Sequence, residues 1–430
     1  MAKISKIFQI PKINFERFCL LPRINLGNKL VLQKSDIVHW VLCFGMLIAY
    51  YGSLTPWFLL PIQAVYSVLA CFPLFAAWLL SRGQKETIFS RQNYLYPLAS
   101  FLLLGIVAAL VNTKNINGYI LLSFNGFIFY LLFRMDVNEL ERMGTFMAKT
   151  LAVILSISIP FYILYLLGFS LPHYHISPSG FNYSFENYRF FLIDDRFALE
   201  LIPRFHSVFL EPSHIGMACV VMLFSQIGKW NRWYNIVFFV TIIMTFSLAA
   251  YIFLVFLFFA ASWMKGKSIV LKLVLLISLC LIGVLVALSY NKGDNLVNQL
   301  IVQRLVINED GKLEGDNRVS SIFEREYDKM ASTSEILVGR GSEQLKRFEG
   351  GIAGYRVYIY RDGLISVFFL VIFLLLVINS SCNKRAKIVF LLVQFLSFIP
   401  HAMPLRFYFF IPLYIMLFQK PQQSIEHNIY

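Results

Sequence analysis

An arginine, a glutamate and two histidines lie within a short stretch of the chain: Arg204, His206, Glu211 and His214. Glu211 stands directly before Pro212, and a carboxylate followed by proline and small residues is a common helix start. One interpretation is that Glu211 only caps this helix. The other is that Glu211 accepts a proton from a substrate hydroxyl, while the N–H groups of the first helical turn bind an anion. The residues alone leave both interpretations open.

A second basic group lies later in the chain, and most of its members are typical of a solvated surface. Arg340 differs because Gly339 and Gly341 on either side of it let the backbone approach a ligand closely. An arginine fork suits a diphosphate, to which it donates two parallel hydrogen bonds. Arg356 and Arg361 come just before an apolar segment, where they either anchor the chain at a membrane surface or contact substrate. The group comprises Arg318, Arg325, Arg340, Lys346, Arg347, Arg356 and Arg361.

The elements that must position these side chains are apolar segments of membrane-spanning length. Of the 430 residues, 58% are hydrophobic and only 14% are charged, whereas a soluble domain is about one quarter charged. The apolar residues fall in blocks separated by charged loops, which predicts an all-α polytopic membrane protein of about twelve transmembrane helices. The predicted segments are 37–52, 56–80, 95–111, 118–133, 146–169, 212–227, 234–246, 251–264, 269–289, 364–378, 388–399 and 405–418.

Two of the apolar runs are too long for one upright helix, and we interpret each as a pair of short crossings. Splitting 234–264 at a turn near Thr245 keeps the flanking basic residues, Arg232 and Lys265, at the same membrane face. The run 388–418 contains Pro400 and Pro404 near its middle. It is split in the same way, with a re-entrant hairpin as the alternative.

The distribution of charge predicts the orientation of the chain. Roughly 22 of the 38 Lys and Arg residues, against about 7 acids, fall on one face, which the positive-inside rule assigns to the cytoplasm. Both tails, 1–36 and 419–430, are then cytoplasmic, and the protein lies in the cytoplasmic (inner) membrane. The basic tail 1–36 has no signal-peptide pattern; it either lies on the inner membrane surface or is disordered.

The same orientation divides the rest of the chain into membrane parts and outer loops. Residues 37–169, 212–289 and 363–418 form the membrane part. Two long extracytoplasmic loops, 170–211 and 290–362, lie on the outer face. Loops of this length are usually functional or disordered, so these two are where we expect the chemistry.

Composition and the absence of several motifs exclude other classes. The net charge of +14 follows from the topology, so no nucleic-acid partner is expected. There is no Walker A loop, no GxGxxG, no GxSxG and no His/Cys/Asp cluster at metal-ligand spacing, so neither cofactor nor metal is expected. The 6 cysteines lie in apolar or short basic segments, which argues against a disulfide framework. The apolar segments hold almost no ionisable residues, unlike those of ion-coupled transporters.

Four segments, taken in order, resemble the O-antigen polymerase and ligase superfamily. They are Arg204–Gly216, Thr245–Tyr251, Ile336–Gly341 and Asp362–Val367, within the second half of the chain. The first half resembles the superfamily only in hydropathy. Some polymerases carry outer-loop arginines that are followed by ten residues and a glycine. The stretch that begins at Arg340 has this spacing, and the one that begins at Arg204 is one residue longer.

The resemblance implies a metal-independent membrane glycosyltransferase that acts on the outer face of the cytoplasmic membrane. Its substrates would be oligosaccharide repeat units on undecaprenyl diphosphate, which it would join into O-antigen, capsular or exopolysaccharide. Membrane lipid and a chain-length regulator are further implied partners. Under this resemblance, Arg204 and Arg340 bind the diphosphate and Glu211 or His214 takes the proton. The residues expected to contact substrate are His206, Arg356 and Arg361.

Two alternative functions make different demands on the sequence. An O-antigen ligase relies on a histidine in its large late loop, whereas 290–362 contains none, which favours the polymerase. A lipid-linked oligosaccharide flippase or another transporter of twelve spans usually has two similar halves, and no such similarity is seen here. The histidines expected on the outer side are His173, His175, His206, His214 and His401.

Overall fold

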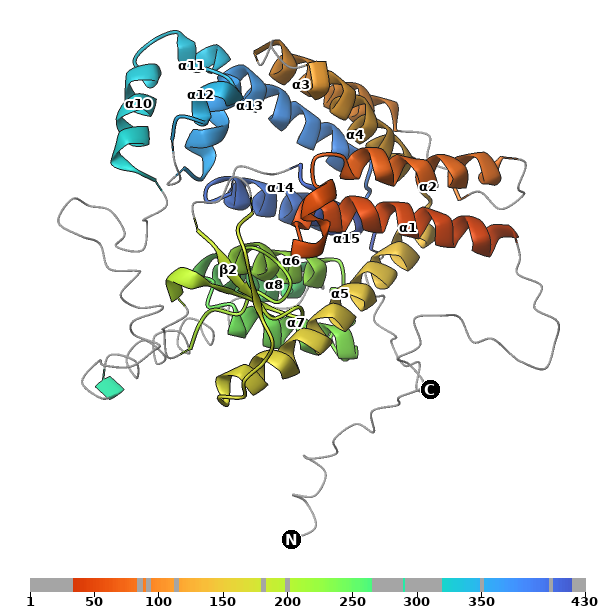
Figure 1. The fold of residues 1–430 in the computed structure, drawn as a ribbon. Coiled ribbons are helices and arrows are strands. Elements are labelled where there is room, and N and C mark those ends of the chain that lie inside the picture. The colour runs from red at the N-terminus through yellow and green to blue at the C-terminus, as the bar shows by residue number, and fades with distance from the viewer. Residues whose placement is uncertain are drawn as a thin grey trace.

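The structure is a computed structural model that describes residues 34–82, 88–89, 94–111, 116–178, 183–197, 202–264, 289–290, 319–348, 352–401 and 405–419. These residues are mostly helical (Figure 1). The first helices are α1 (Lys34–Leu54), α2 (Tyr66–Ser81), α3 (Leu95–Val111), α4 (Ile116–Arg134), α5 (Val137–Leu166), α6 (Pro212–Phe224), α7 (Trp233–Met244) and α8 (Leu248–Met264). The later helices are α10 (Ser321–Ala331), α11 (Glu335–Val338), α12 (Ser342–Leu345), α13 (Tyr355–Asn379), α14 (Lys384–Phe398) and α15 (Phe407–Met416).

Three of the described helices, α1, α5 and α13, are long and apolar enough to cross a membrane. Shorter apolar helices, α2 to α4, α6 to α8 and α15, accompany them. Large apolar side chains are exposed on several of these helices, among them Phe72, Tyr96, Ile243 and Phe368. Exposing this much apolar surface is unfavourable in water but not in lipid. Length, composition and exposure are therefore all consistent with a membrane protein.

Eleven of the twelve predicted apolar segments coincide with a helix, namely α1 to α8 and α13 to α15. The twelfth, 269–289, lies outside the described residues except for its last residue. The bounds differ most at three helix starts: α2 begins at Tyr66 and not at residue 56, and α13 begins at Tyr355 and not at residue 364. The third, α5, begins at Val137 and not at residue 146. Asp136 caps this helix by accepting a hydrogen bond from the Asn138 N–H at 3.0 Å, so the charged first turns are helical too.

The apolar run 234–264 folds as two helices, which confirms that it does not form one. α7 ends at Met244 and α8 begins at Leu248, with Phe246 in the left-handed region at φ 45° between them. The rings of Phe239 and Phe258 stack at 5.9 Å, so the two helices lie side by side. The run 388–418 also folds back, because the rings of Phe390 in α14 and Phe410 in α15 are 6.0 Å apart.

Two short helices, α6 and α15, form the centre of the bundle. Every residue of α15 is buried, and His214 is the one residue of α6 that is not. Because other helices surround them, their lengths need not match the thickness of a bilayer. Their first turns lie together, with the rings of His214 and Tyr408 6.1 Å apart. The centre of the molecule therefore brings two helix N-termini to one end.

The end of the bundle that holds these N-termini, here called the Glu211 end, collects distant parts of the chain. Trp57, after α1, donates a backbone hydrogen bond to the Val208 carbonyl at 2.9 Å. Arg406, before α15, donates to the Ser53 carbonyl at 3.4 Å. The last turns of α5 also reach this end, where the Tyr162 hydroxyl donates to the Pro203 carbonyl.

The opposite end of the bundle, here called the Lys229 end, holds turns that the charge pattern places in the cytoplasm. Lys229, after α6, forms an ion pair with Glu141 in the first turns of α5. Arg385, at the start of α14, donates to the Trp263 carbonyl at the end of α8, at 3.1 Å. Turns are divided between two ends in this way when successive helices run in alternating directions.

The expectation of an all-α chain is incomplete, because three short strands before α6 form a small antiparallel sheet. Its strands, in spatial order, are β1 (Tyr174–Ile176), β2 (Phe185–Asn187) and β3 (Leu192–Asp194). Phe185 and Leu192 are buried against Leu210, just before α6. The Leu192 N–H also donates to the Ser207 carbonyl at 2.8 Å. The sheet is thus fixed to the chain that leads into α6.

The described part of the predicted late loop, residues 319–348, is folded and contains three helices. α10, α11 and α12 pack against the first turns of α13, and Figure 1 shows them together at one side of the molecule. Phe323 and Met330 of α10 are fully buried in a small core that also contains Tyr360. The strongly amphipathic sequence of α10 provides that apolar face.

Two glycines allow α11 to lie directly on the backbone of α13. α13 breaks at Gly363, whose φ is 77°, and the break separates the 355–362 turns from the long apolar part. A Cβ at Gly363 would lie 2.3 Å from the Leu337 carbonyl oxygen, and a Cβ at Gly339 would lie 2.7 Å from the Arg361 carbonyl oxygen. Only glycine fits both the positive φ and this close approach.

Candidate functional site

The N-terminus of α6 is positioned by its own sequence and by its central location. Pro212 occupies the first turn, where its missing N–H costs no hydrogen bond, and Glu211 stands at the N-cap. The Glu211 side chain makes no capping hydrogen bond to the helix. The interpretation of Glu211 as a simple cap is therefore not what the geometry shows.

The Glu211 carboxylate points to its neighbours on α6 instead. It accepts a hydrogen bond from the Ser213 hydroxyl at 3.1 Å, and it lies 3.5 Å from His214 Nε2. About a third of the Glu211 side chain is exposed (34%), whereas the His214 side chain is only 13% exposed. A carboxylate that is reachable and has an imidazole beside it is suited to accept a proton and pass it on.

The hairpin of α14 and α15 completes the surroundings of this pair. The rings of His214 and His401 are 6.0 Å apart. Tyr408, the second residue of α15, lies close enough to both Glu211 and Arg406 to feel their charges. Arg406 occupies the N-cap of α15. The Glu211 end thus combines a carboxylate, two imidazoles, a guanidinium and a phenol from three helices.

Tyr183, two residues before β2, lies near enough to Glu211 to feel its charge. Burial, and then the negative charge of Glu211, raise the pKa of Tyr183 to about 12, against the opposing effect of Arg196. The Arg196 guanidinium lies 3.5 Å over the Tyr183 ring and pairs with Asp194. Tyr183 is therefore a neutral phenol within the electrostatic reach of the carboxylate.

Arg204 and His206 hold the loop before α6 in place. Arg204 donates to the Thr245 carbonyl at 3.1 Å, in the turn between α7 and α8. His206 is almost fully buried, and its Nδ1 lies 3.0 Å from the Leu210 carbonyl. Burial first, and then the positive charge of Arg204, lower the pKa of His206 to about 4. His206 was expected to contact substrate, but the structure places it beneath the surface as a neutral group.

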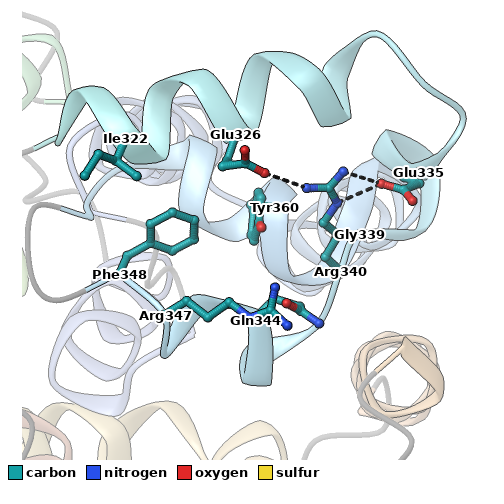
Figure 2. A pocket seen from close by; sticks show the side chains of 9 residues that line it. All are labelled: Ile322, Glu326, Glu335, Gly339, Arg340, Gln344, Arg347, Phe348 and Tyr360. Carbon is teal, nitrogen blue, oxygen red and sulfur yellow. Dashed lines mark hydrogen bonds and ion pairs between the residues drawn. The ribbon is translucent and has the colours of Figure 1, made fainter.

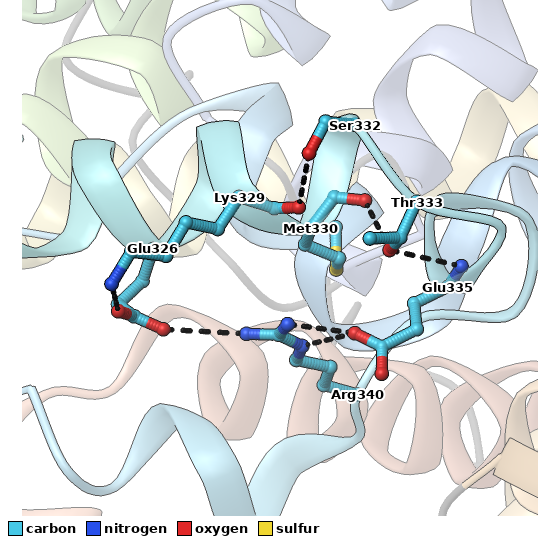
Figure 3. Close-up of polar contacts among 7 residues, drawn as sticks. All are labelled: Glu326, Lys329, Met330, Ser332, Thr333, Glu335 and Arg340. Atoms are coloured by element: carbon cyan, nitrogen blue, oxygen red, sulfur yellow. Dashed lines mark hydrogen bonds and ion pairs between the residues drawn. The ribbon is translucent and has the colours of Figure 1, made fainter.

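Arg340 lies elsewhere, in a cavity of about 590 Å³ between α10, α12 and α13 (Figure 2). Its guanidinium is 2.7 Å from Glu335 and 3.4 Å from Glu326, which hold it from two sides (Figure 3). Hydrogen bonds to Tyr360 and Glu335 raise the pKa of Arg340 above its usual range. The cavity is lined by Ile322, Glu326, Glu335, Gly339, Arg340, Gln344, Arg347, Phe348 and Tyr360.

The remaining predicted arginines are also paired. Arg356 Nη1 is 2.8 Å from Glu324 Oε1, and Arg361 Nη2 is 2.6 Å from Asp362 Oδ2. Arg361 also lies 5.4 Å over the ring of Tyr358. The seven predicted site residues therefore do not form a single site. One group lies before and at the start of α6, and the other lies around α10 to α13.

A packed path joins the two groups of site residues. The Tyr355 N–H donates to the Ile399 carbonyl at 3.2 Å. The rings of Tyr358 and Phe398 are 5.2 Å apart. Two residues after Ile399, the ring of His401 approaches His214. The last turn of α14 therefore separates the Glu211 pair from the arginines of α13.

One further group could hold a metal ion, although the sequence indicated none. Ligand atoms of His175, Glu186 and Asp195 lie within 4.8 Å of one another. The sequence predicts His175 and His401 on the outer side, but it predicts neither this group nor the approach of His401 and Arg406 to Glu211. Strand pairing and the α14–α15 turn bring these residues together from distant positions. Comparisons of the chain with protein-family models, with curated proteins and with solved structures found no match.

Proposed function

We propose that this chain is an extracytoplasmic glycan polymerase that joins oligosaccharide units carried on a lipid diphosphate. The observation that carries the proposal is the Glu211–His214 pair, 3.5 Å apart and partly exposed at the N-terminus of α6. The resemblance of the segments around Arg204, Thr245 and Arg340 to the O-antigen polymerase superfamily supports it. The lipid is undecaprenyl, and the product is O-antigen, capsular or exopolysaccharide.

The proposed topology puts this pair outside the cytoplasm. About twelve helices cross the cytoplasmic membrane, both termini are cytoplasmic, and residues 170–211 and 290–362 face outward. The sorting of turns into a Glu211 end and a Lys229 end supports this arrangement, because the basic turns of the Lys229 end fit the cytoplasmic side.

In the proposed reaction, Glu211 is the general base. The oxygen of an acceptor hydroxyl forms a bond to the anomeric carbon of the donor sugar, and the bond from that carbon to the lipid diphosphate breaks. Glu211 takes the hydroxyl proton, and His214, at hydrogen-bonding reach of Glu211, orients the carboxylate and shares the proton. The leaving lipid diphosphate carries away the negative charge.

The developing charge on the diphosphate calls for cations and N–H donors at the same end. The N-terminus of α15 and its cap residue Arg406 supply both, next to Tyr408. Arg204, which donates to the Thr245 carbonyl in the turn between α7 and α8, is a further cation before α6. Arg340, with Arg347, Phe348 and Tyr360, lines a separate cavity that suits another part of the substrate. There, sugar rings would stack on the aromatic faces and acidic groups would meet the arginines.

The proposal is tested in a deletion strain of the source organism that is complemented with wild type, Glu211→Gln, Arg204→Ala or Arg340→Ala. Glu141→Gln is the matched control, because Glu141 is a carboxylate paired with a basic side chain at the opposite end. Surface glycan is resolved by length, and the amount of each variant is measured by blot. We expect wild-type polymer from Glu141→Gln and a loss of at least about 100-fold, the size of a general-base contribution, from Glu211→Gln.

The products distinguish the proposed polymerase from its alternatives. Single repeat units on the surface of cells with well-expressed Glu211→Gln would show that export proceeds and polymerisation fails. Accumulation of lipid-linked units inside the cell would instead identify a flippase. Full-length polymer that is no longer attached to its final acceptor would identify a ligase. Normal polymer from Glu211→Gln would refute the role of the carboxylate.

A further inference from the structure

The small sheet over the Glu211 end gathers two histidines and two carboxylates on one face. His173 and His175 are two residues apart at the start of β1, so their side chains project to the same side. His175 is paired directly across the ladder with Glu186 of β2, and Asp195 follows β3. None of the four takes part in the proposed transfer reaction.

From this arrangement we propose that His173, His175, Glu186 and Asp195 bind a divalent transition-metal ion of the Zn²⁺ class. Two imidazoles with carboxylates are a ligand set that Zn²⁺ accepts, whereas Ca²⁺ and Mg²⁺ prefer oxygen ligands alone.

The separations between ligand atoms fit a shared ion. Two ligands at about 2.1 Å from one Zn²⁺ ion lie about 3.4 Å apart when the geometry is tetrahedral. The His173 Nε2 to Glu186 Oε2 distance is 2.9 Å, and the His175 Nε2 to Glu186 Oε1 distance is 3.6 Å. His175 Nδ1 and Asp195 Oδ2 are 3.9 Å apart. Only one nitrogen of His175 can bind a given ion. One ligand atom from each of His175, Glu186 and Asp195 lies within 4.8 Å of the others, so small side-chain rotations would bring these three ligands around one centre. His173 Nε2 would reach that centre through its place beside Glu186.

One histidine is already oriented as a ligand. His173 Nδ1 lies 3.2 Å from the Leu171 carbonyl, which accepts its hydrogen bond. The other ring nitrogen, Nε2, then carries the lone pair and faces Glu186. Metal-binding histidines commonly use one nitrogen for a backbone carbonyl in this way, because the bond fixes the tautomer and the ring direction.

Two carboxylate oxygens in the group lack the partners that buried oxygens need. Glu186 Oε2 and Asp195 Oδ1 are buried atoms without a hydrogen bond from any described residue. Glu186 Oε2 is 2.9 Å from His173 Nε2, but the alignment is not that of a hydrogen bond. Such orphaned oxygens are costly, and a cation bound between these carboxylates would remove the cost.

The ion would stabilise a sheet that has little else to hold it. Each strand has three residues, and sheets of this size are marginal by themselves. The ligands come from β1, from β2 and from the end of β3, so one ion joins all three strands. Because β2 begins two residues after Tyr183, whose phenol feels the charge of Glu211, the metal would also hold that phenol near the proposed catalytic pair.

The test uses the purified full chain in detergent, stripped with a chelator and titrated with ZnCl₂ by calorimetry and by metal analysis. The variants are His175→Gln and Glu186→Gln. His214→Gln is the matched control, because it removes a histidine that also lies beside a glutamate but belongs to the other site. MgCl₂ and CaCl₂ serve as oxygen-preferring probes. The thermal melting of each stripped protein shows that the variants fold.

We expect wild type and His214→Gln to bind one Zn²⁺ per chain and to melt at a higher temperature with it. His175→Gln and Glu186→Gln should lose at least about tenfold in Zn²⁺ affinity, while their metal-free melting stays near that of wild type. Equal Zn²⁺ binding by all four proteins, or none by wild type, would overturn the proposal. So would a cluster that responds only to pH, which would mean that protonated histidines hold the carboxylates. These measurements need no transferase activity, so their outcome does not depend on whether the chain is the proposed polymerase.

Discussion

Lowering the pH from 7.5 to 5 should destabilise the loop before α6 through His206, by about 2 kcal/mol. His206 is buried with Leu210 as its hydrogen-bond acceptor, and its pKa is lowered from 6.5 to about 4. Burial is the largest cause, followed by the charge of Arg204, while Asp194 and Glu211 act in the opposite direction. In the unfolded chain the same imidazole titrates near its usual pKa.

The sign follows from proton binding. Between pH 6.5 and 4 the unfolded chain binds a proton at His206 and the folded chain does not, so acid favours unfolding. The full difference of about 2.5 pKa units corresponds to roughly 3 kcal/mol, which is reached only below pH 4. Above pH 6.5 the contribution is close to zero, so stability should rise with pH through this window and then level off.

The assay is thermal melting in detergent at pH 7.5, 6 and 5 for wild type and for His206→Asn. Asparagine keeps a donor at the δ position for the Leu210 carbonyl but does not titrate. The other titratable groups are common to both proteins, so the pH dependence of their difference in melting temperature isolates His206. The two curves should converge as the pH falls. If wild type and His206→Asn lose stability in parallel, His206 is charged in the folded protein and the reasoning is refuted.

Two further substitutions test how the late part of the chain is held. Gly363→Ala should destabilise the packing of α11 on α13 by more than Gly168→Ala, in thermal melting and in proteolysis of residues 319–348. Both glycines have positive φ, which would cost an alanine about 1–2 kcal/mol. Only at Gly363 would the added Cβ also meet backbone atoms, so equal effects of the two substitutions would contradict the close approach of α11 to α13. Asn383→Ala should cost about 1 kcal/mol of stability because the Asn383 side chain accepts from the Ala386 N–H at the start of α14. Asn383→Ser, which retains an acceptor, should restore most of it in the same melting assay, and no recovery would mean that the cap is not the cause.

The helices were the more predictable part of the fold because apolar run length is a local property. The split of 234–264 followed from charge at its ends, and the structure has its turn at Thr245 as expected. The start of α5 was placed too late because its first turns are charged, although Asp136 is a recognisable cap. Whether each of the short helices spans the bilayer depends on their neighbours, as the fully buried α15 illustrates.

The site was predictable only where its residues are neighbours in sequence. Glu211 and His214 are three residues apart at a helix start, so they had to lie on one side of α6. Arg406 and His401 join them through the α14–α15 turn, which no local pattern reveals. The cluster of His175 with Glu186 and Asp195 likewise depends on strand register. Burial decides the role of His206, and a single polar residue in a loop gives no signal of burial.

The pairing of the late arginines bears on where an anionic substrate binds. Arg340, Arg356 and Arg361 each have a carboxylate within hydrogen-bonding distance. A diphosphate would have to compete with that carboxylate at each arginine. At Arg361 it would also leave Asp362, whose side chain is only 4% exposed, as an unpaired buried carboxylate, which is costly.

At the N-terminus of α15, an anion would compete with a hydroxyl and not with a carboxylate. The cap residue of α15, Arg406, contributes a cation, and no side chain of that cap residue occupies the helix N–H groups. Ser53 accepts from the Tyr408 N–H at 2.8 Å, but a hydroxyl is displaced more easily than a carboxylate because it is neutral. If the chain is the proposed polymerase, the first turn of α15 is therefore the better place for the leaving diphosphate. The cavity around Arg340 is then left to the glycan, which carries less charge and can use Tyr360 and Phe348.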